Sequence, residues 1–191
     1  MNRTSSKTGF TLLHGWGGLA TAISLITIPF ISPAFRKICL PYIPASPAQI
    51  ANVLTALKYR SGNLVDLGSG DGRIVIIIVR AAAALNFNAV GIELNIWLIM
   101  YSRLLSLIKG YSKNTRFYRQ NLWSFNLKSY SNVVVFGTEH MMSLIKEKCL
   151  QELPSKSVII TCRFPLPNLK ADQIIGKGID TVWKYDVLKI N

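Results

Sequence analysis

Apolar and polar positions alternate along this chain in a way that predicts strands and helices in turn. Short apolar runs bounded by glycine, asparagine or proline are typical of buried strands, and longer stretches with apolar residues three and four apart are typical of helices. We predict strands at 64–67, 89–93, 116–118, 133–136 and 158–162, helices at 73–85, 95–108 and 141–150, and a closing strand within 181–188. This alternation indicates an α/β fold, with a mostly parallel sheet covered by helices on both faces.

One further helix is predicted before the first strand. Ser46 is a suitable N-cap, Pro47 suits the first helical position, and Gln49 lies three residues after the cap. Gly62 ends this helix. We therefore predict one domain over residues 48–191, which is long enough to bury a core.

The N-terminal part of the chain has a different composition. No charged residue lies between Lys7 and Arg36, and residues 10–31 are mostly apolar. About 20 apolar residues of helix cross a bilayer core. We predict a basic segment at 1–9, a membrane-anchoring transmembrane helix at 10–31 and a linker at 32–47. A cleaved signal peptide is the alternative, disfavoured by the length of the apolar run and the lack of a clear cleavage site.

The chain carries a net charge of +13, and its first acidic residue is Asp66. An acid-poor N-terminus rich in Ser, Thr, Lys and Arg is typical of mitochondrial targeting segments. The positive charge favours an anionic membrane surface or an acidic partner. We expect no nucleic-acid partner, because the basic residues are spread along the chain. The three cysteines are far apart and the two histidines complete no ligand pattern, so we predict packed, reduced thiols and no metal site.

The candidate chemistry is concentrated where the first predicted strand ends. There Asp66 is followed by three glycines at every second position, Gly68, Gly70 and Gly72. Glycine adopts positive φ and lets a ligand approach the backbone, so this turn suits a nucleotide-type ligand. A dinucleotide-binding turn is the nearest competitor. It requires G-x-G-x-x-G spacing, and Asp71 inside the present turn would repel a pyrophosphate.

Two more polar residues follow the next predicted strands. Glu93 ends the second strand, where a carboxylate can accept hydrogen bonds from both hydroxyls of a ribose. Asn121 follows the third strand, at a place where an Asn or Asp often receives the amino group of an adenine. Both would lie at the same edge of the sheet as the glycine turn, because the carboxyl ends of parallel strands share one edge.

Residues 64–73 resemble motif I of the class I S-adenosylmethionine-dependent methyltransferases. In that Rossmann-like fold the strand-end acid holds the amino acid end of the cofactor. The resemblance implies a cofactor site for S-adenosyl-L-methionine made of Asp66, Gly68, Gly70, Asp71, Gly72, Glu93 and Asn121. Longer stretches resemble the mitochondrial lysine methyltransferases that act on the c subunit of ATP synthase; these are 29–45, 65–75, 91–97, 162–167 and 178–186. A sister group that modifies the adenine nucleotide translocase shares most of them.

This resemblance implies a protein-lysine N-methyltransferase with a single-pass anchor in the mitochondrial inner membrane. Its expected substrate is a membrane-proximal lysine of an integral membrane protein. The c subunit of ATP synthase is the first expectation, and the translocase is the alternative. Three places depart from the family: Asn121, where the family usually has Asp, the Thr-Glu-His at 138–140, and the stretch 76–88, which is a few residues longer than expected. Within the second, Glu139 is a candidate for orienting the substrate ammonium, and Phe164 and Pro165 are candidates for a channel wall. No catalytic base is predicted, because desolvation of the lysine suffices.

Three other interpretations stay open at the level of sequence. One is a methyltransferase with a different acceptor, such as an RNA or a small molecule. Another is a nicotinamide enzyme. The third is an inactive cofactor-binding domain that serves as a membrane-tethered partner.

Overall fold

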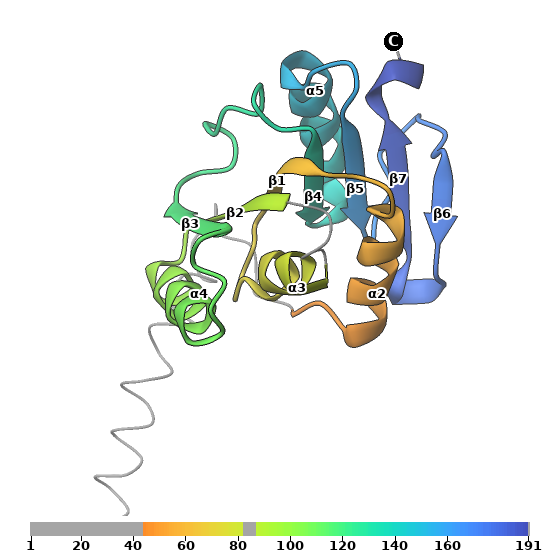
Figure 1. Ribbon diagram of the computed structural model, residues 1–191. Coiled ribbons are helices and arrows are strands. Elements are labelled where there is room, and N and C mark those ends of the chain that lie inside the picture. Colours follow the sequence, from red (N-terminus) through yellow and green to blue (C-terminus); the bar gives the residue numbers. More distant parts are fainter. Residues whose placement is uncertain (1–43, 82–86, 191) are drawn as a thin grey trace, which may run out of the picture. The chain divides into compact units, whose positions relative to one another are not determined.

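A seven-stranded mixed sheet forms the centre of the protein. The computed structural model describes residues 44–81 and 87–190, so the predicted anchor at 10–31 and most of the linker lie outside the described residues. The strand order is β3-β2-β1-β4-β5-β7-β6 (Figure 1). The first five strands are parallel, and β7 runs antiparallel between β5 and β6. The bounds are β1 Gly62–Leu67, β2 Phe87–Glu93, β3 Thr115–Arg119, β4 Asn132–Phe136, β5 Val158–Cys162, β6 Gln173–Ile175 and β7 Val182–Asp186.

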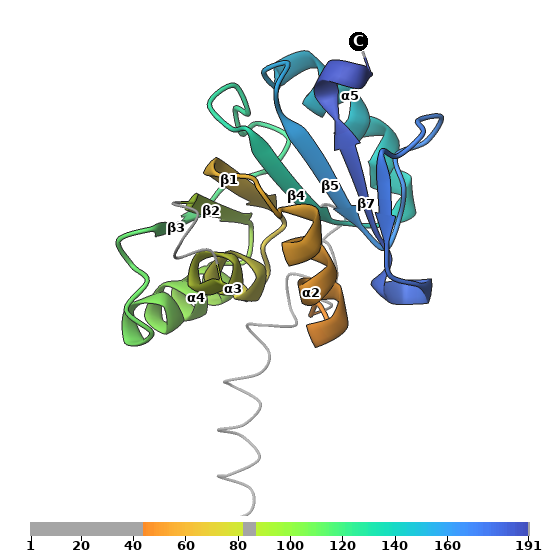
Figure 2. The ribbon, with the colours of Figure 1, turned by 45° about the vertical axis from the view of Figure 1, so that its right-hand side comes forward.

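Helices cover both faces of this sheet, as the sequence predicts. They are α2 Pro47–Ala56, α3 Arg73–Ala81, α4 Ile96–Ile108 and α5 Met142–Glu152, and short 3-10 turns lie at Glu139–Met141, Gly178–Asp180 and Val187–Lys189. The helices α2, α3 and α4 lie on one face and α5 lies on the other (Figure 2). The protein is therefore a three-layer α/β structure, which is the predicted fold class.

Two apolar clusters hold the layers together, and the period-2 alternation of the strands separates them. Leu64 of β1 packs under α2 and α3, together with Val53 and Ile78. Its neighbour Val65 points to the opposite face, where it joins Ile145 and other residues of α5. A strand buried on both faces requires a continuous apolar run, and for this reason the central strands are readable in the sequence.

The predicted elements agree with the structure except at the end of α2, at the edge strand β6 and at the closing strand. Helix α2 ends at Ala56 and not at Gly62, which is instead the first residue of β1. A turn at 57–60, with Tyr59 at a φ of 64° and the Arg60 amide donating to the Leu57 carbonyl, already ends the helix. The three-residue edge strand β6 is absent from the prediction, because Gln173 and Ile174 are exposed and a strand this short gives no period. Helix α3 is predicted to reach residue 85, and residues 82–86 lie outside the described part. The closing strand is shorter than predicted, because residues 187–189 form a 3-10 turn capped by the Asp186 side chain. Within the described ranges, no helix combines the length and apolar character needed to span a bilayer.

The strand order places a topological switch point at the carboxyl end of β1. Its neighbours are β2 on one side and β4 on the other. The connections after β1 and β4 therefore lead to opposite faces of the sheet, since α3 covers one and α5 the other. Ligands of open α/β sheets bind at such a switch point.

Candidate functional site

The glycine turn joins β1 to α3 and is fixed to the end of β2. Gly68, Gly70 and Gly72 all have positive φ, at 81°, 54° and 73°. The amides of Gly68 and Ser69 both donate to the carbonyl of Ile92, at 2.9 and 3.0 Å. A residue with a Cβ would be strained in these conformations. The predicted turn is thus held in place by its backbone, and its position is set by the adjacent strand.

Asp66 is fully buried beneath this turn, and neither carboxylate oxygen has a hydrogen-bond partner among the described residues. Burial, together with the nearby carboxylates of Glu93 and Asp71, raises the pKa of Asp66 to about 8. A buried carboxyl group without a donor is costly, and an added cationic donor would relieve the cost. The Ser69 hydroxyl, which sequence reasoning missed, is also buried and unpartnered within the described ranges. These two side chains mark a place that can receive a positively charged hydrogen-bond donor.

Glu93 lies at the end of β2, and three backbone amides hold its side chain. Its Oε2 accepts from Gly70 at 3.1 Å, and its Oε1 accepts from Leu94 and Asn95 at 2.8 and 2.9 Å. Carboxylate oxygens accept more than one hydrogen bond each, so acceptor capacity remains. The structure therefore brings Glu93 to the turn, as the sequence predicts, and fixes its rotamer.

The floor of the turn is packed too tightly for any residue but glycine. A Cβ at Gly91 would lie 2.6 Å from the Ser69 Oγ and 2.7 Å from Phe117 Cδ1. A Cβ at Gly72 would lie 2.6 Å from Phe117 Cε1. Phe117, in β3, thus supports the turn from below; its role could not be seen in the sequence, since it depends on the pairing of β2 with β3.

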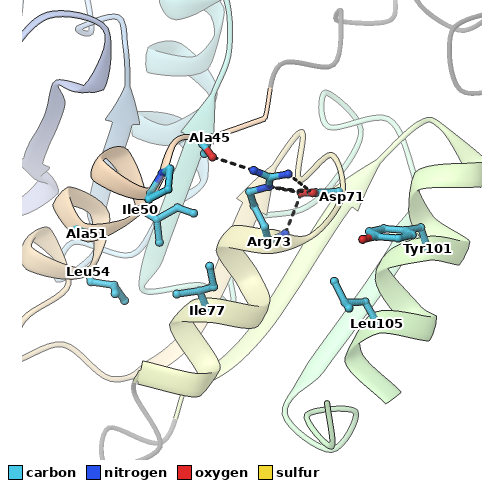
Figure 3. Close-up of a pocket in the computed structure, with 10 residues that line it drawn as sticks. Ala45, Ile50, Ala51, Leu54, Asp71, Arg73, Ile77, Tyr101 and Leu105 are labelled. Atoms are coloured by element: carbon cyan, nitrogen blue, oxygen red, sulfur yellow. Dashed lines mark hydrogen bonds and ion pairs between the residues drawn. The ribbon is translucent and has the colours of Figure 1, made fainter. Parts of the chain in front are cut away.

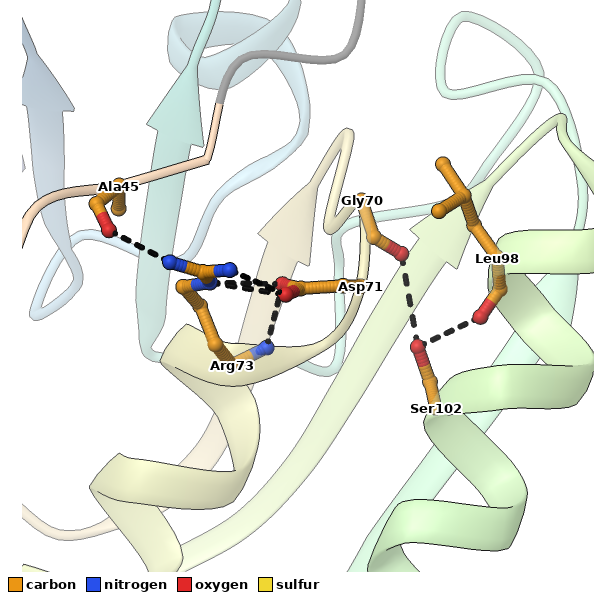
Figure 4. Close-up of polar contacts among 6 residues, drawn as sticks. All are labelled: Ala45, Gly70, Asp71, Arg73, Leu98 and Ser102. Carbon is orange, nitrogen blue, oxygen red and sulfur yellow. Dashed lines mark hydrogen bonds and ion pairs between the residues drawn. The ribbon is translucent and has the colours of Figure 1, made fainter. Parts of the chain in front are cut away.

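The Asp71 side chain is bound by Arg73 and does not point freely into the cofactor site (Figure 4). Its carboxylate accepts from the Arg73 backbone amide and from Nε, and it forms an ion pair with Nη2 at 2.7 Å. Arg73 Nη1 also donates to the carbonyl of Ala45 at 3.1 Å. The pair therefore ties the turn to the segment that precedes α2. Ser102 of α4 gives a second tie, through a 3.4 Å hydrogen bond to the Gly70 carbonyl.

An apolar groove of about 500 Å³ opens beside this ion pair, between α2, α3 and α4 (Figure 3). Asp71 and Arg73 lie at one end, and Ile50, Ile77 and Leu105 lie along its walls. The groove is thus mostly apolar, with one charged end adjoining the turn.

Asn121 lies in the loop after β3, as predicted, and its side chain shapes that loop. Its Oδ1 accepts from the Trp123 amide at 3.1 Å, and its carbonyl accepts from Ser124. Asx turns of this kind are a common local role for Asn. Its Oδ1 can accept a second hydrogen bond, so the contact with an adenine amino group stays a prediction.

The three substrate-site candidates follow β4 and β5 at the same edge of the sheet. Glu139 is exposed in the 3-10 turn after β4. Phe164 is half-buried against the α5 side of the core, and Pro165 is exposed. The next residue, Leu166, donates its amide to the Tyr185 hydroxyl at 2.8 Å. Phe164 therefore has a packing role already, and its part in a channel wall stays a prediction.

Comparison with known proteins identifies the family. Residues 66–173 match the family described as the ANTKMT methyltransferase domain, and residues 5–36 match the N-terminal domain of the ATP synthase c-subunit lysine N-methyltransferases. The chain belongs to this family of methyltransferases. An ATP synthase c-subunit lysine N-methyltransferase from Xenopus laevis is 48% identical over 90% of this chain and 74% of that protein. The one from Homo sapiens is 47% identical over 95% and 76%.

The sister group is also similar. An adenine nucleotide translocase lysine N-methyltransferase from Mus musculus is 38% identical over 92% of this chain and 77% of that protein. Among solved structures, an RNA methyltransferase from Salinibacter ruber in complex with S-adenosyl-L-homocysteine has a TM-score of 0.69, with 22% identity, and covers 76% of this chain and 94% of that chain. At this identity the likeness establishes the class I methyltransferase fold alone.

The methyl donor of such a domain is S-adenosyl-L-methionine, and the residues at the turn fit it. That molecule carries an ammonium group, a sulfonium and a ribose with two hydroxyls. The unpaired, buried Asp66 carboxylate suits the ammonium, and the immobilised Glu93 carboxylate suits the hydroxyls. The positive φ angles at the turn leave the backbone open to close approach.

Proposed function

We propose that this chain transfers methyl groups from S-adenosyl-L-methionine to a lysine of the c subunit of ATP synthase. Relatives named for that substrate, at 42–48% identity, support it. The observation that carries the proposal is the Asp66 carboxylate, which is fully buried beneath the glycine turn. Within the part of the chain that the structure describes, no donor satisfies this group, whereas a cationic ligand would.

Asp66, Glu93 and the three glycines would hold the cofactor, which when bound supplies an electrophilic methyl group. Asp71 contributes indirectly, because its ion pair with Arg73 fixes the turn. A lysine amine has a pKa of about 10.4 in water and must be neutral to act as a nucleophile. Burial of that amine lowers its pKa, so the protein has to exclude water and position the amine rather than supply a strong base. Glu139 and the Phe164-Pro165 pair are the proposed residues for this positioning.

The cofactor assignment is tested by calorimetry on Asp66→Asn and Glu93→Gln. Each should weaken binding by about 1.5–3 kcal/mol, the range for hydrogen bonds to a charged group. Glu147→Gln is the matched control, because Glu147 is an exposed carboxylate on α5, remote from the turn. Unchanged affinity in both site variants would remove these residues from the cofactor site.

The substrate is tested by the intact mass of the ATP synthase proteolipid, its c subunit, from cells with and without the protein. We expect the methyl groups to disappear in the deletion and to return with the wild-type chain but not with Asp66→Asn. An identical mass in both cells would exclude this substrate. The translocase, favoured by the 38% identical relative, would then be examined in the same way. Normal cofactor binding with no methyl acceptor at all would favour an inactive partner protein.

We also propose that residues 10–31 anchor the chain in the mitochondrial inner membrane by a single pass. The charge-free apolar span between Lys7 and Arg36 supports this. Ala45 is buried in the domain and accepts a hydrogen bond from Arg73, so residues 32–43 would form the tether between the anchor and the domain. A tether of this length extends at most about 42 Å, so the catalytic domain would stay near the bilayer and meet membrane-proximal lysines at high effective concentration. Carbonate extraction of mitochondria tests the anchor. Full-length protein in the supernatant would show that the segment does not span.

A further inference from the structure

Helix α4 presents large apolar side chains to solvent along its whole length. The exposed residues Trp97, Met100, Tyr101, Leu104, Leu107 and Ile108 follow one another at helical spacing and form what we call the α4 face. Leu104 is 57% exposed and Ile108 is 72% exposed. Contiguous apolar surface of this kind marks an interaction site in a soluble domain.

Helix α4 has large apolar side chains on both its buried and its exposed side. Its inward positions are Leu98 and Ile99, together with Ser102 and Ser106, and all four are buried. Ser102 donates to the Leu98 carbonyl at 2.8 Å, and Ser106 shares a hydrogen bond with Thr115 of β3. The buried side of α4 is thus filled by two apolar and two small polar residues, and the six large apolar side chains of the α4 face remain on the exposed side. Packing of this domain does not explain the outward residues, so they require an occupant from outside it.

The charges around the α4 face identify the kind of occupant. Between Glu93 and Glu139 the sequence has no acidic residue and six basic ones. Five of these, Arg103, Lys109, Lys113, Arg116 and Arg119, lie on or just after α4 and are exposed. An apolar helix face with a purely basic rim complements an anionic lipid surface, where lysine and arginine meet the headgroups.

Two more features agree with a bilayer. Trp97, Tyr101 and Tyr118 are exposed in this region, and such rings favour the membrane–water interface. A hollow of about 270 Å³ beside the face is lined by Arg103, Arg116 and Tyr118. The guanidinium groups of Arg103 and Arg116 donate to the carbonyls of Phe117 and Ser112, and each keeps further N–H donors for a headgroup phosphate.

We propose that the α4 face docks in the plane of an anionic bilayer. This inference rests on the proposed action at a membrane and adds the surface that does it. Helix α4 begins three residues after Glu93, and Ser102 contacts the glycine turn through Gly70. A helix of this length is about 20 Å long, so docking it flat holds the carboxyl edge of the sheet close to the lipid surface. The cofactor site would then face lysines at the membrane boundary.

The test uses the full chain with an environment-sensitive dye at Leu104→Cys, in a Cys39→Ser background. The other two thiols are buried. The matched control carries the dye at Leu144→Cys on α5, which is 53% exposed and lies on the opposite face. Both proteins are reconstituted in vesicles of phosphatidylcholine and phosphatidylglycerol that contain spin-labelled lipid with its nitroxide near the top of the acyl chain.

We expect the nitroxide to quench the dye at Leu104 several-fold more strongly than the dye at Leu144. The difference should shrink at high salt or without phosphatidylglycerol, since the basic rim supplies part of the attraction. Equal quenching of the two dyes would overturn the proposal. An unquenched but blue-shifted dye at Leu104 would also overturn it, because that result indicates that a protein segment or a second copy covers the face. An unquenched dye in a watery environment would overturn it as well, because the face would then be exposed to solvent.

A second measurement separates this proposal from the proposed function. The double variant Leu104→Glu/Ile108→Glu should bind the cofactor normally and methylate the detergent-solubilised proteolipid of ATP synthase at the wild-type rate. Its rate on the same proteolipid in the bilayer should fall several-fold. Equal rates in the bilayer for variant and wild type would contradict docking through α4. No methylation by the wild-type chain in either medium would instead contradict the substrate, and the quenching result would stand alone.

Discussion

Replacing Asp66 by Asn should change how the stability of the cofactor-free protein depends on pH. The pKa of Asp66 is about 8 in the folded state, against 3.8 for a free aspartate side chain. Between these values the folded protein keeps the proton and the unfolded chain releases it. The free energy of unfolding should therefore fall as the pH rises from about 4 to about 8, because the unfolded state binds fewer protons.

The size of this effect follows from the shift. Each pKa unit corresponds to about 1.4 kcal/mol, so the shift from 3.8 to about 8 sets an upper limit of about 6 kcal/mol. Relaxation around the ionised group will reduce it. Asn keeps the shape of the side chain but cannot ionise, so the variant should lose this part of the pH dependence and become more stable than wild type near pH 8.

The assay is thermal unfolding of both proteins in the same detergent at a series of pH values. The difference between the two curves isolates Asp66, since every other group titrates in both. We expect the difference to grow in favour of the Asp66→Asn variant up to about pH 8. Parallel curves across the range would refute the interpretation of Asp66 as a destabilised, donor-free carboxyl group. Cofactor binding should release a proton below pH 8, measurable by calorimetry in buffers of different ionisation enthalpy, because an ammonium partner favours the ionised form.

Three further predictions concern the turn and the core. Gly72→Ala should lower the free energy of unfolding by about 2–4 kcal/mol, since it adds a clash to the left-handed strain. Gly110 has a similar φ, +75° against +73°, but open space around it, so Gly110→Ala is the matched control. An equal loss of stability for the two variants in urea titrations would contradict the clash. Arg73→Lys should lower the free energy of unfolding by about 1 kcal/mol and speed hydrogen exchange in the segment before α2, because lysine cannot bind Asp71 and the Ala45 carbonyl at the same time, as arginine does. Unchanged hydrogen exchange would argue that Arg73 does not hold this segment to the turn. The thiols of Cys149 and Cys162 should resist iodoacetamide at pH 8 until the protein unfolds. Burial raises the pKa of Cys149 to about 12, and burial together with the Asp66 carboxylate raises the pKa of Cys162. Peptide mapping of the alkylated native protein measures this resistance.

The sequence by itself determines the order of the elements and the place of the cofactor turn. Strands buried on both faces need continuous apolar runs, and β1, β4 and β5 are readable for this reason. The turn can be recognised in the sequence because glycine is the residue that best accepts its positive φ angles. Glu93 can be recognised because a strand end has a fixed place in a βαβ unit. These are local constraints, and local constraints leave a pattern in the chain.

Other features are decided only by the tertiary structure, because they depend on residues far apart in sequence. That Asp66 has no donor among the described residues follows from what packs around it, and the need for Gly91 follows from Phe117 on the next strand. Helix α4 is apolar on nearly all sides in sequence, so its pattern cannot say which side is buried. The structure buries Leu98, Ile99, Ser102 and Ser106 against the sheet and leaves Leu104 and Ile108 exposed. Periodicity finds the helix, but only packing against β2 and β3 decides which of its faces is free to bind.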